Sequence, residues 1–181
     1  IFNLCDGRLT AVVADVVGKG IPAALLSASI RGALAATAGC CGDLGDVLAR
    51  LNDQVCAETL PSEFVTLVMV AADARRGQLG YCLAGHEPLL RWRDGQVDTL
   101  EEGGLVLGLY PHETYRETTL AIKPGDLFLL YTDGIVDARN FAGELFGRQR
   151  LLDALRQYGG LPVDQVLRNT LWDVRRFVGL A

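Results

Sequence analysis

Two aspartates stand out as residues that could do chemistry. Asp15 lies in the segment ADVVGKG and Asp133 in LYTDGIVDA, so each ends an apolar run that predicts a strand, and a glycine-containing turn follows. A carboxylate among buried valines must be paired, hydrogen-bonded or metal-bound, because a bare one is costly there. Mg²⁺ and Mn²⁺ prefer such hard oxygen ligands and often bridge to phosphate groups. Two interpretations stay open: a metal site, or strand-end aspartates that cap turns.

Lys19, between Gly18 and Gly20, suggests a phosphate-binding loop. That loop requires a glycine six residues before the lysine and Ser or Thr directly after it. Val13 and Gly20 occupy these two positions, which argues against a nucleotide-binding loop. The glycine turn still favours an anion weakly, because it precedes a predicted helix.

The histidines and cysteines favour no nucleophile. His86 and His112 are the only histidines, and no catalytic triad can be built from their local spacing. His86 follows a predicted strand, so it either lines the same face as the two aspartates or makes a hydrogen bond in a turn. The five cysteines are odd in number and lack a C-x-x-C pair, which predicts reduced, mostly buried thiols.

Composition excludes several classes of protein. With 181 residues, 50% of them hydrophobic and 22% charged, the chain predicts one soluble globular domain and excludes disorder. A net charge of −5 without a basic patch excludes nucleic acid as a partner. Residues 21–38 contain Pro22 and Arg31 and are too short to span a membrane comfortably. No targeting signal is visible, so we expect a cytoplasmic protein and an excised fragment.

The pattern of apolar residues predicts the elements that carry these side chains. A strand is expected over residues 9–17, followed by helices over 23–37 and from 43 onward. Three hairpins then follow, over residues 64–85, 89–100 and 118–131, and helices return past residue 148. Grouped strands with grouped helices predict an α+β fold in which helices cover antiparallel sheet.

Six segments in order resemble landmarks of bacterial PPM-type serine/threonine phosphatases of the stage II sporulation E family, which are protein phosphatase 2C-like. They are residues 15–28, 64–73, 83–90, 107–115, 123–140 and 143–147. Because the segments span most of the chain in family order, chance resemblance is improbable.

The resemblance implies a four-layer α/β/β/α sandwich of two antiparallel sheets flanked by helices, with two Mn²⁺ or Mg²⁺ ions. It implies that Asp15 is a metal ligand bridging both ions, with the Val16 backbone carbonyl as a further ligand. Asp133 is implied as a ligand to one ion, so Asp15 and Asp133 are the expected catalytic residues. The implied reaction is attack by metal-activated water on a phosphoester. Asp137 and Asn140 match in loop geometry and stay outside the metal set.

The chain departs from the family pattern at both ends. The family places one acidic motif before the first residue here and an Asp-Asp motif after the last helix. We therefore expect residues 1–181 to be a phosphatase domain truncated at both ends, with two acidic ligands absent. Asp6 matches a hairpin position and not the first acidic motif. Val17 stands where a serine is usual.

The resemblance implies a phosphatase acting on a phosphorylated Ser/Thr protein, by family analogy an anti-sigma-factor antagonist. It also implies an upstream sensor or regulatory domain in the parent protein. From the residues alone we expect no membrane partner. The alternative is a non-catalytic phosphatase-like module that binds a regulatory partner.

Overall fold

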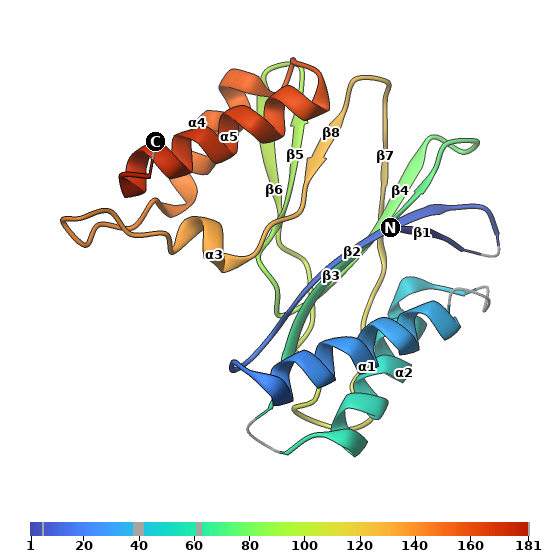
Figure 1. The fold of residues 1–181 in the computed structure, drawn as a ribbon. Coiled ribbons are helices and arrows are strands. Elements are labelled where there is room, and N and C mark those ends of the chain that lie inside the picture. The colour runs from blue at the N-terminus through green and yellow to red at the C-terminus, as the bar shows by residue number, and fades with distance from the viewer. Residues whose placement is uncertain (5, 38–41, 61–62, 181) are drawn as a thin grey trace. The chain divides into compact units, whose positions relative to one another are not determined.

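The computed structural model describes residues 1–4, 6–37, 42–60 and 63–180 (Figure 1). They form two compact units, and the chain enters each unit twice. The first unit contains Ile1–His86 and Glu101–Ile122, and the second contains Glu87–Leu100 and Lys123–Ala181. No described helix is both long and apolar enough to cross a membrane.

The first unit holds a five-stranded antiparallel sheet and two helices. The strand order is β1-β2-β3-β4-β7. The bounds are β1 (Phe2–Asn3), β2 (Leu9–Val16), β3 (Val65–Asp73), β4 (Gln78–Ala84), β7 (Thr118–Ala121), α1 (Ile21–Thr37) and α2 (Leu44–Glu58). Continuous apolar runs in β3 and β4 account for their burial on both faces.

Helix α2 shows how the sequence builds this unit. Asp43 caps its first turn, because the carboxylate accepts a hydrogen bond of 2.6 Å from the Gly45 amide. Leu44, Leu48 and Leu51 repeat at helical spacing and are buried in the core with the alternate residues of β3. The predicted helix from residue 43 is confirmed.

The second unit holds a three-stranded antiparallel sheet and three helices. The strand order is β6-β5-β8. The bounds are β5 (Leu89–Arg93), β6 (Gln96–Leu100), β8 (Leu127–Leu129), α3 (Asp133–Val136), α4 (Gly147–Tyr158) and α5 (Val163–Val178). Leu90 of the sheet packs in one core cluster with Leu151, Leu155 and Val166 of the helices.

The third predicted hairpin is wrong. β7 pairs with β4 in the first unit, and β8 pairs with β5 in the second. The turn itself forms, because the Asp126 amide donates to the Lys123 carbonyl at 3.1 Å. Pro124 and Gly125 specify only the local turn, whereas a strand takes the sheet edge that offers it hydrogen bonds. The predicted α+β class with two antiparallel sheets is nevertheless confirmed.

Candidate active site

Asp15 lies near the end of β2 with its side chain exposed. The burial argument from the sequence is therefore wrong for this residue, because its neighbours Ala14 and Val17 are exposed too. Among the described residues, no side chain or amide donates a hydrogen bond to the Asp15 carboxylate. Both carboxylate oxygens are thus available to a ligand.

The pairing of β2 with β3 places Thr66 directly opposite Asp15. Directly opposed residues in an antiparallel pair share one face of the sheet. The Thr66 hydroxyl lies 2.8 Å from Nδ1 of His86, which follows β4. His86 therefore makes a side-chain hydrogen bond and stands beside the register partner of Asp15.

Gly85 fixes the position of His86. Its φ is +60°, a value that side chains rarely tolerate. A Cβ at this position would lie 2.3 Å from Cγ1 of Val106, so the backbone also needs the space that glycine leaves. The sequence LAGHEP thus contains a local signal for this bend.

The Val16 carbonyl lies on the open edge of β2. The amide of Val17 donates at 3.1 Å to the carbonyl of Phe64, the residue before β3. Successive residues of a strand direct their backbone groups to opposite sides, so the polar groups of Val16 point away from β3. On that side β1 pairs only with Leu9 and Thr10, which leaves the Val16 carbonyl unpaired by strand β1.

Asp133 belongs to the second unit. β8 ends at Leu129, so Asp133 is not the last residue of a strand but the first residue of α3. Its side chain is exposed, and no described group donates to its carboxylate. Its backbone carbonyl accepts a hydrogen bond of 2.7 Å from the amide of Asp137, the C-cap of this short helix.

The donor set fits hard divalent cations in its chemistry. Asp15, Val16 and Asp133 offer only oxygen atoms, which Mg²⁺ and Mn²⁺ prefer, and neither carboxylate is engaged by a described group. Within the described ranges, no group of three or more His, Cys, Asp or Glu side chains is placed to hold a metal ion. The residues predicted as ligands therefore suit a divalent cation in the type of their donor atoms.

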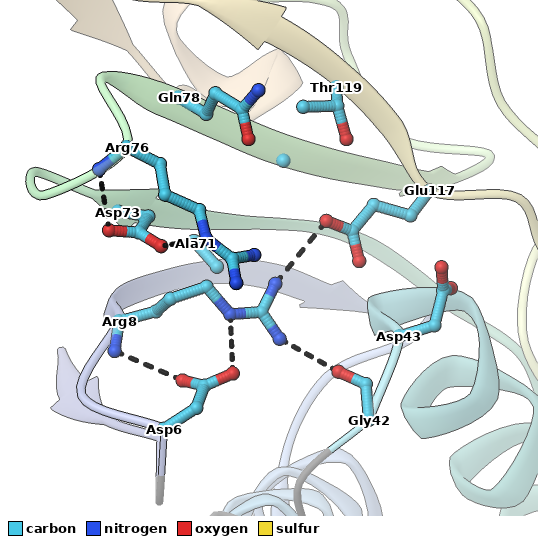
Figure 2. A pocket seen from close by; sticks show the side chains of 11 residues that line it. Asp6, Arg8, Gly42, Asp43, Ala71, Asp73, Arg76, Gln78, Glu117 and Thr119 are labelled. Carbon is cyan, nitrogen blue, oxygen red and sulfur yellow. Dashed lines mark hydrogen bonds and ion pairs between the residues drawn. The ribbon is translucent and has the colours of Figure 1, made fainter.

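Figure 2 shows a pocket of about 420 Å³ in the first unit. Asp6 and Arg8 line it just before β2 begins, whereas Asp15 lies near the other end of that strand. The charged groups of the pocket satisfy one another. Arg8 donates to Asp6, to Glu117 and, at 2.7 Å, to the Gly42 carbonyl, while Glu117 accepts from the Leu44 amide at 2.7 Å. The network ties the β1–β2 turn to the start of α2, and Asp6 has the hairpin position expected of it.

The described cysteines are unsuited to nucleophilic catalysis. Cys82 is buried, and burial raises the pKa of its thiol to about 12. Cys56 is half-buried, and burial raises its pKa as well. Both thiols stay protonated at neutral pH, whereas the thiolate is the nucleophile. Cys5, Cys40 and Cys41 lie outside the described residues.

Asn52 is a structural residue that sequence reasoning missed. It is fully buried in α2, where its amide donates to the Tyr110 carbonyl at 2.8 Å and its oxygen accepts from the Gly108 amide at 3.0 Å. These bonds hold segment 108–110 against the helix. Asn52 follows Leu48 by four residues, so the helical spacing puts a polar residue on the apolar face of the predicted helix. That position is the sequence signal that could have revealed its role.

Comparison with known proteins decides the family. Residues 5–180 match the sequence family described as Stage II sporulation protein E. The chain belongs to this family. Its resemblance to PPM-type phosphatases is thereby confirmed.

Individual relatives agree with this membership. The phosphoserine phosphatase RsbU of Bacillus subtilis is 32% identical over 139 residues, which are 76% of this chain and 42% of RsbU. This chain therefore spans less than half of RsbU. The SiaA-PP2C domain of Pseudomonas aeruginosa is 25% identical with a TM-score of 0.79, over 96% of this chain and 74% of that chain.

A more distant structure shares the fold. The catalytic domain of the serine threonine protein phosphatase PstP, in complex with two manganese ions, has a TM-score of 0.70 at 20% identity. The match covers 96% of this chain and 83% of that chain.

Proposed function

We propose that this chain is the catalytic part of a metal-dependent phosphatase that hydrolyses phosphoserine or phosphothreonine in a protein. One observation carries the proposal: Asp15 and Asp133 are exposed carboxylates without a described hydrogen-bond donor, in a family that includes the phosphoserine phosphatase RsbU. An aspartate that only capped a turn would accept a backbone hydrogen bond, as Asp43 does.

Asp15, the Val16 carbonyl and Asp133 would hold the metal, Mn²⁺ or Mg²⁺, and two ions are expected in the active enzyme. Manganese in PstP, a protein of the same fold, supports this choice. Bound divalent ions supply a water of lowered pKa and stabilise negative charge on the transferring phosphoryl group. The carboxylates of Asp15 and Asp133 would contribute fixed negative charge and hold the metal in place.

No protein nucleophile is needed for this reaction, which agrees with the protonated thiols of Cys56 and Cys82. Thr66 lies opposite Asp15 on the same sheet face, and its hydrogen bond to His86 positions that ring near Asp15. From the family resemblance, we propose an anti-sigma-factor antagonist as the phosphoprotein substrate.

The test is Mn²⁺-dependent release of phosphate from a phosphoserine protein by the full-length protein that contains this chain. Asp15→Asn or Asp133→Asn should lower kcat at least about a hundredfold, because ligand charge is lost while shape is kept. Asp94→Asn is the matched control, since Asp94 lies in a turn at φ +49°, which asparagine also adopts. Near wild-type rates in a folded Asp15 or Asp133 variant would remove that residue from the metal site. No turnover by the wild type would favour the non-catalytic binding module.

A further inference from the structure

A short segment, residues 104–108, connects helix α2 to the sheet face of Asp15. Within it, Leu107 exchanges two backbone hydrogen bonds with Val65, at 2.9 and 3.0 Å, and both side chains are fully buried. Val65 is the first residue of β3. The next residue, Thr66, lies directly opposite Asp15. The segment therefore holds the end of the strand that carries Thr66.

The same segment holds the bend that carries His86. Its first residue, Gly104, accepts a hydrogen bond of 2.9 Å from the amide of Gly85, the residue before His86. The Gly104 amide in turn donates to the Leu83 carbonyl of β4 at 2.8 Å. The hydrogen bond between His86 and the Thr66 hydroxyl therefore joins two positions whose preceding residues are both bonded to this one segment.

Close packing leaves the segment little room to move. A Cβ at Gly108, whose φ is +91°, would lie 2.6 Å from Cγ1 of Val55 in α2. A Cβ at Gly104 would lie 2.9 Å from Cδ1 of Tyr115, whose side chain is buried. Protein interiors are packed as densely as organic crystals, so they transmit a displacement and do not absorb it in voids. A shift of the segment at its contact with α2 therefore reaches the two strand ends.

Asn52 of α2 binds this segment and the residues directly after it. Asn52 is fully buried, and its oxygen accepts from the Gly108 amide at 3.0 Å and from the Tyr115 hydroxyl at 3.4 Å. Its amide donates to the Tyr110 carbonyl at 2.8 Å. An apolar side chain at this position would leave the buried Gly108 amide without its acceptor, which is costly, so the segment would shift toward another partner.

We propose that Asn52 is a positioning residue, which through segment 104–108 sets the Thr66–His86 hydrogen bond beside Asp15. Asn52 acts through the backbone of the segment and not by contact with the substrate. The consequence for catalysis rests on the proposed function, because Asp15 is there a metal ligand. The placement of His86 by Asn52 does not depend on that function and is measured separately.

The first test records the Nδ1 signal of His86 by NMR in the full-length protein, labelled with ¹⁵N at histidine and kept in EDTA. Loss of the signal in His86→Gln identifies it, and Thr66→Val gives the reference position for a broken hydrogen bond. Asn52→Leu keeps the volume and loses the polar groups, so it should move the signal at least about half of the way to this reference, because hydrogen bonds weaken steeply with angle and distance. Asn52→Ser is the second variant in case Asn52→Leu does not fold, and it should move the signal in the same direction.

Leu48→Ala is the matched control, because Leu48 is as buried as Asn52 and lies one turn earlier on the same face of α2. It removes core packing and no hydrogen bond to the segment. The control should leave the His86 signal within about a tenth of the distance to the reference, although the protein loses stability. An unchanged signal in a folded Asn52 variant, or an equal change in Leu48→Ala, overturns the positioning role.

Activity tests the consequence for the reaction. With Mn²⁺ and a phosphoserine protein, Asn52→Leu should lower kcat about tenfold and change KM less than about twofold, because misplacement affects the reacting geometry more than binding. Leu48→Ala, assayed below its unfolding temperature, should keep kcat within about twofold. A shifted His86 signal with wild-type kcat overturns the role in the reaction. A signal that shifts in Asn52→Leu, in a protein whose wild type releases no phosphate, would reject the phosphatase activity and leave the placement of His86 by Asn52 standing.

Discussion

At the scale of single residues, the carboxylates of this chain differ widely in exposure. The side chains of Asp15 and Asp133 are exposed and accept no hydrogen bond from a described group. By contrast, the Asp126 side chain is only 3% exposed and is bound by Arg93 at 2.6 Å. The same residue type therefore serves opposite purposes in one chain.

The Arg93–Asp126 ion pair makes stability depend on pH. The Arg93 guanidinium lowers the pKa of Asp126 below its ordinary value in the folded protein. The pair therefore stabilises the folded protein fully above about pH 4, and less as the pH falls through the folded pKa of Asp126.

Asp126→Asn should lower the free energy of unfolding in urea by about 2 kcal/mol at pH 7, and by less below pH 4. Asp164→Asn, in an exposed pair with Arg168, should cost under about 0.5 kcal/mol. Equal costs at both pH values would contradict this role.

Lys19 is exposed between two glycines of positive φ and beside a small pocket at the start of α1. It lacks the context of a nucleotide-binding loop. Lys19→Ala should therefore reduce phosphatase activity much less than Asp15→Asn does, and calorimetry with ATP should show no binding. Micromolar ATP affinity that disappears in Lys19→Ala would restore the nucleotide interpretation.

At the scale of elements, the bend after β4 positions His86. Gly85 and Gly77 have nearly equal φ values, +60° and +62°, but only a Cβ at Gly85 would collide with Val106. Gly77→Ala should cost about 1–2 kcal/mol from backbone strain alone. Gly85→Ala should cost about 1–3 kcal/mol more, because the new methyl group overpacks the site. Chemical unfolding of both variants measures the difference. An equal loss of unfolding free energy in the two variants would show that the Val106 side chain moves aside without strain.

At the scale of the whole molecule, the two proposed metal ligands belong to different units. Since the folded chain binds the metal and the unfolded chain does not, binding stabilises the folded chain. At Mn²⁺ one hundred times its dissociation constant, the stabilisation is about 2.7 kcal/mol, which is a rise in Tm of roughly 5–11 °C for a chain of this size.

Thermal unfolding with Mn²⁺ or with EDTA checks this expectation. Asp15→Asn and Asp133→Asn should each lose most of the metal-induced rise in Tm, whereas Asp94→Asn should keep it. Removal of the metal by EDTA should return wild type to the Tm of the apo protein. A full rise in Asp133→Asn would mean that the second unit contributes no ligand.

The sequence by itself determined most of the elements and singled out Asp15 and Asp133 as the predicted metal ligands. Apolar spacing along α2 and α5 is a local property, and so are the glycines that follow Asp15 and Asp133 in the sequence. Tertiary structure decided which strands pair and which side chains meet. β7 and β8 flank one turn yet join different sheets, and Thr66 meets His86 only because β3 and β4 place them together. Local periodicity reports which face of an element is apolar, whereas exposure and strand pairing depend on residues distant in the chain.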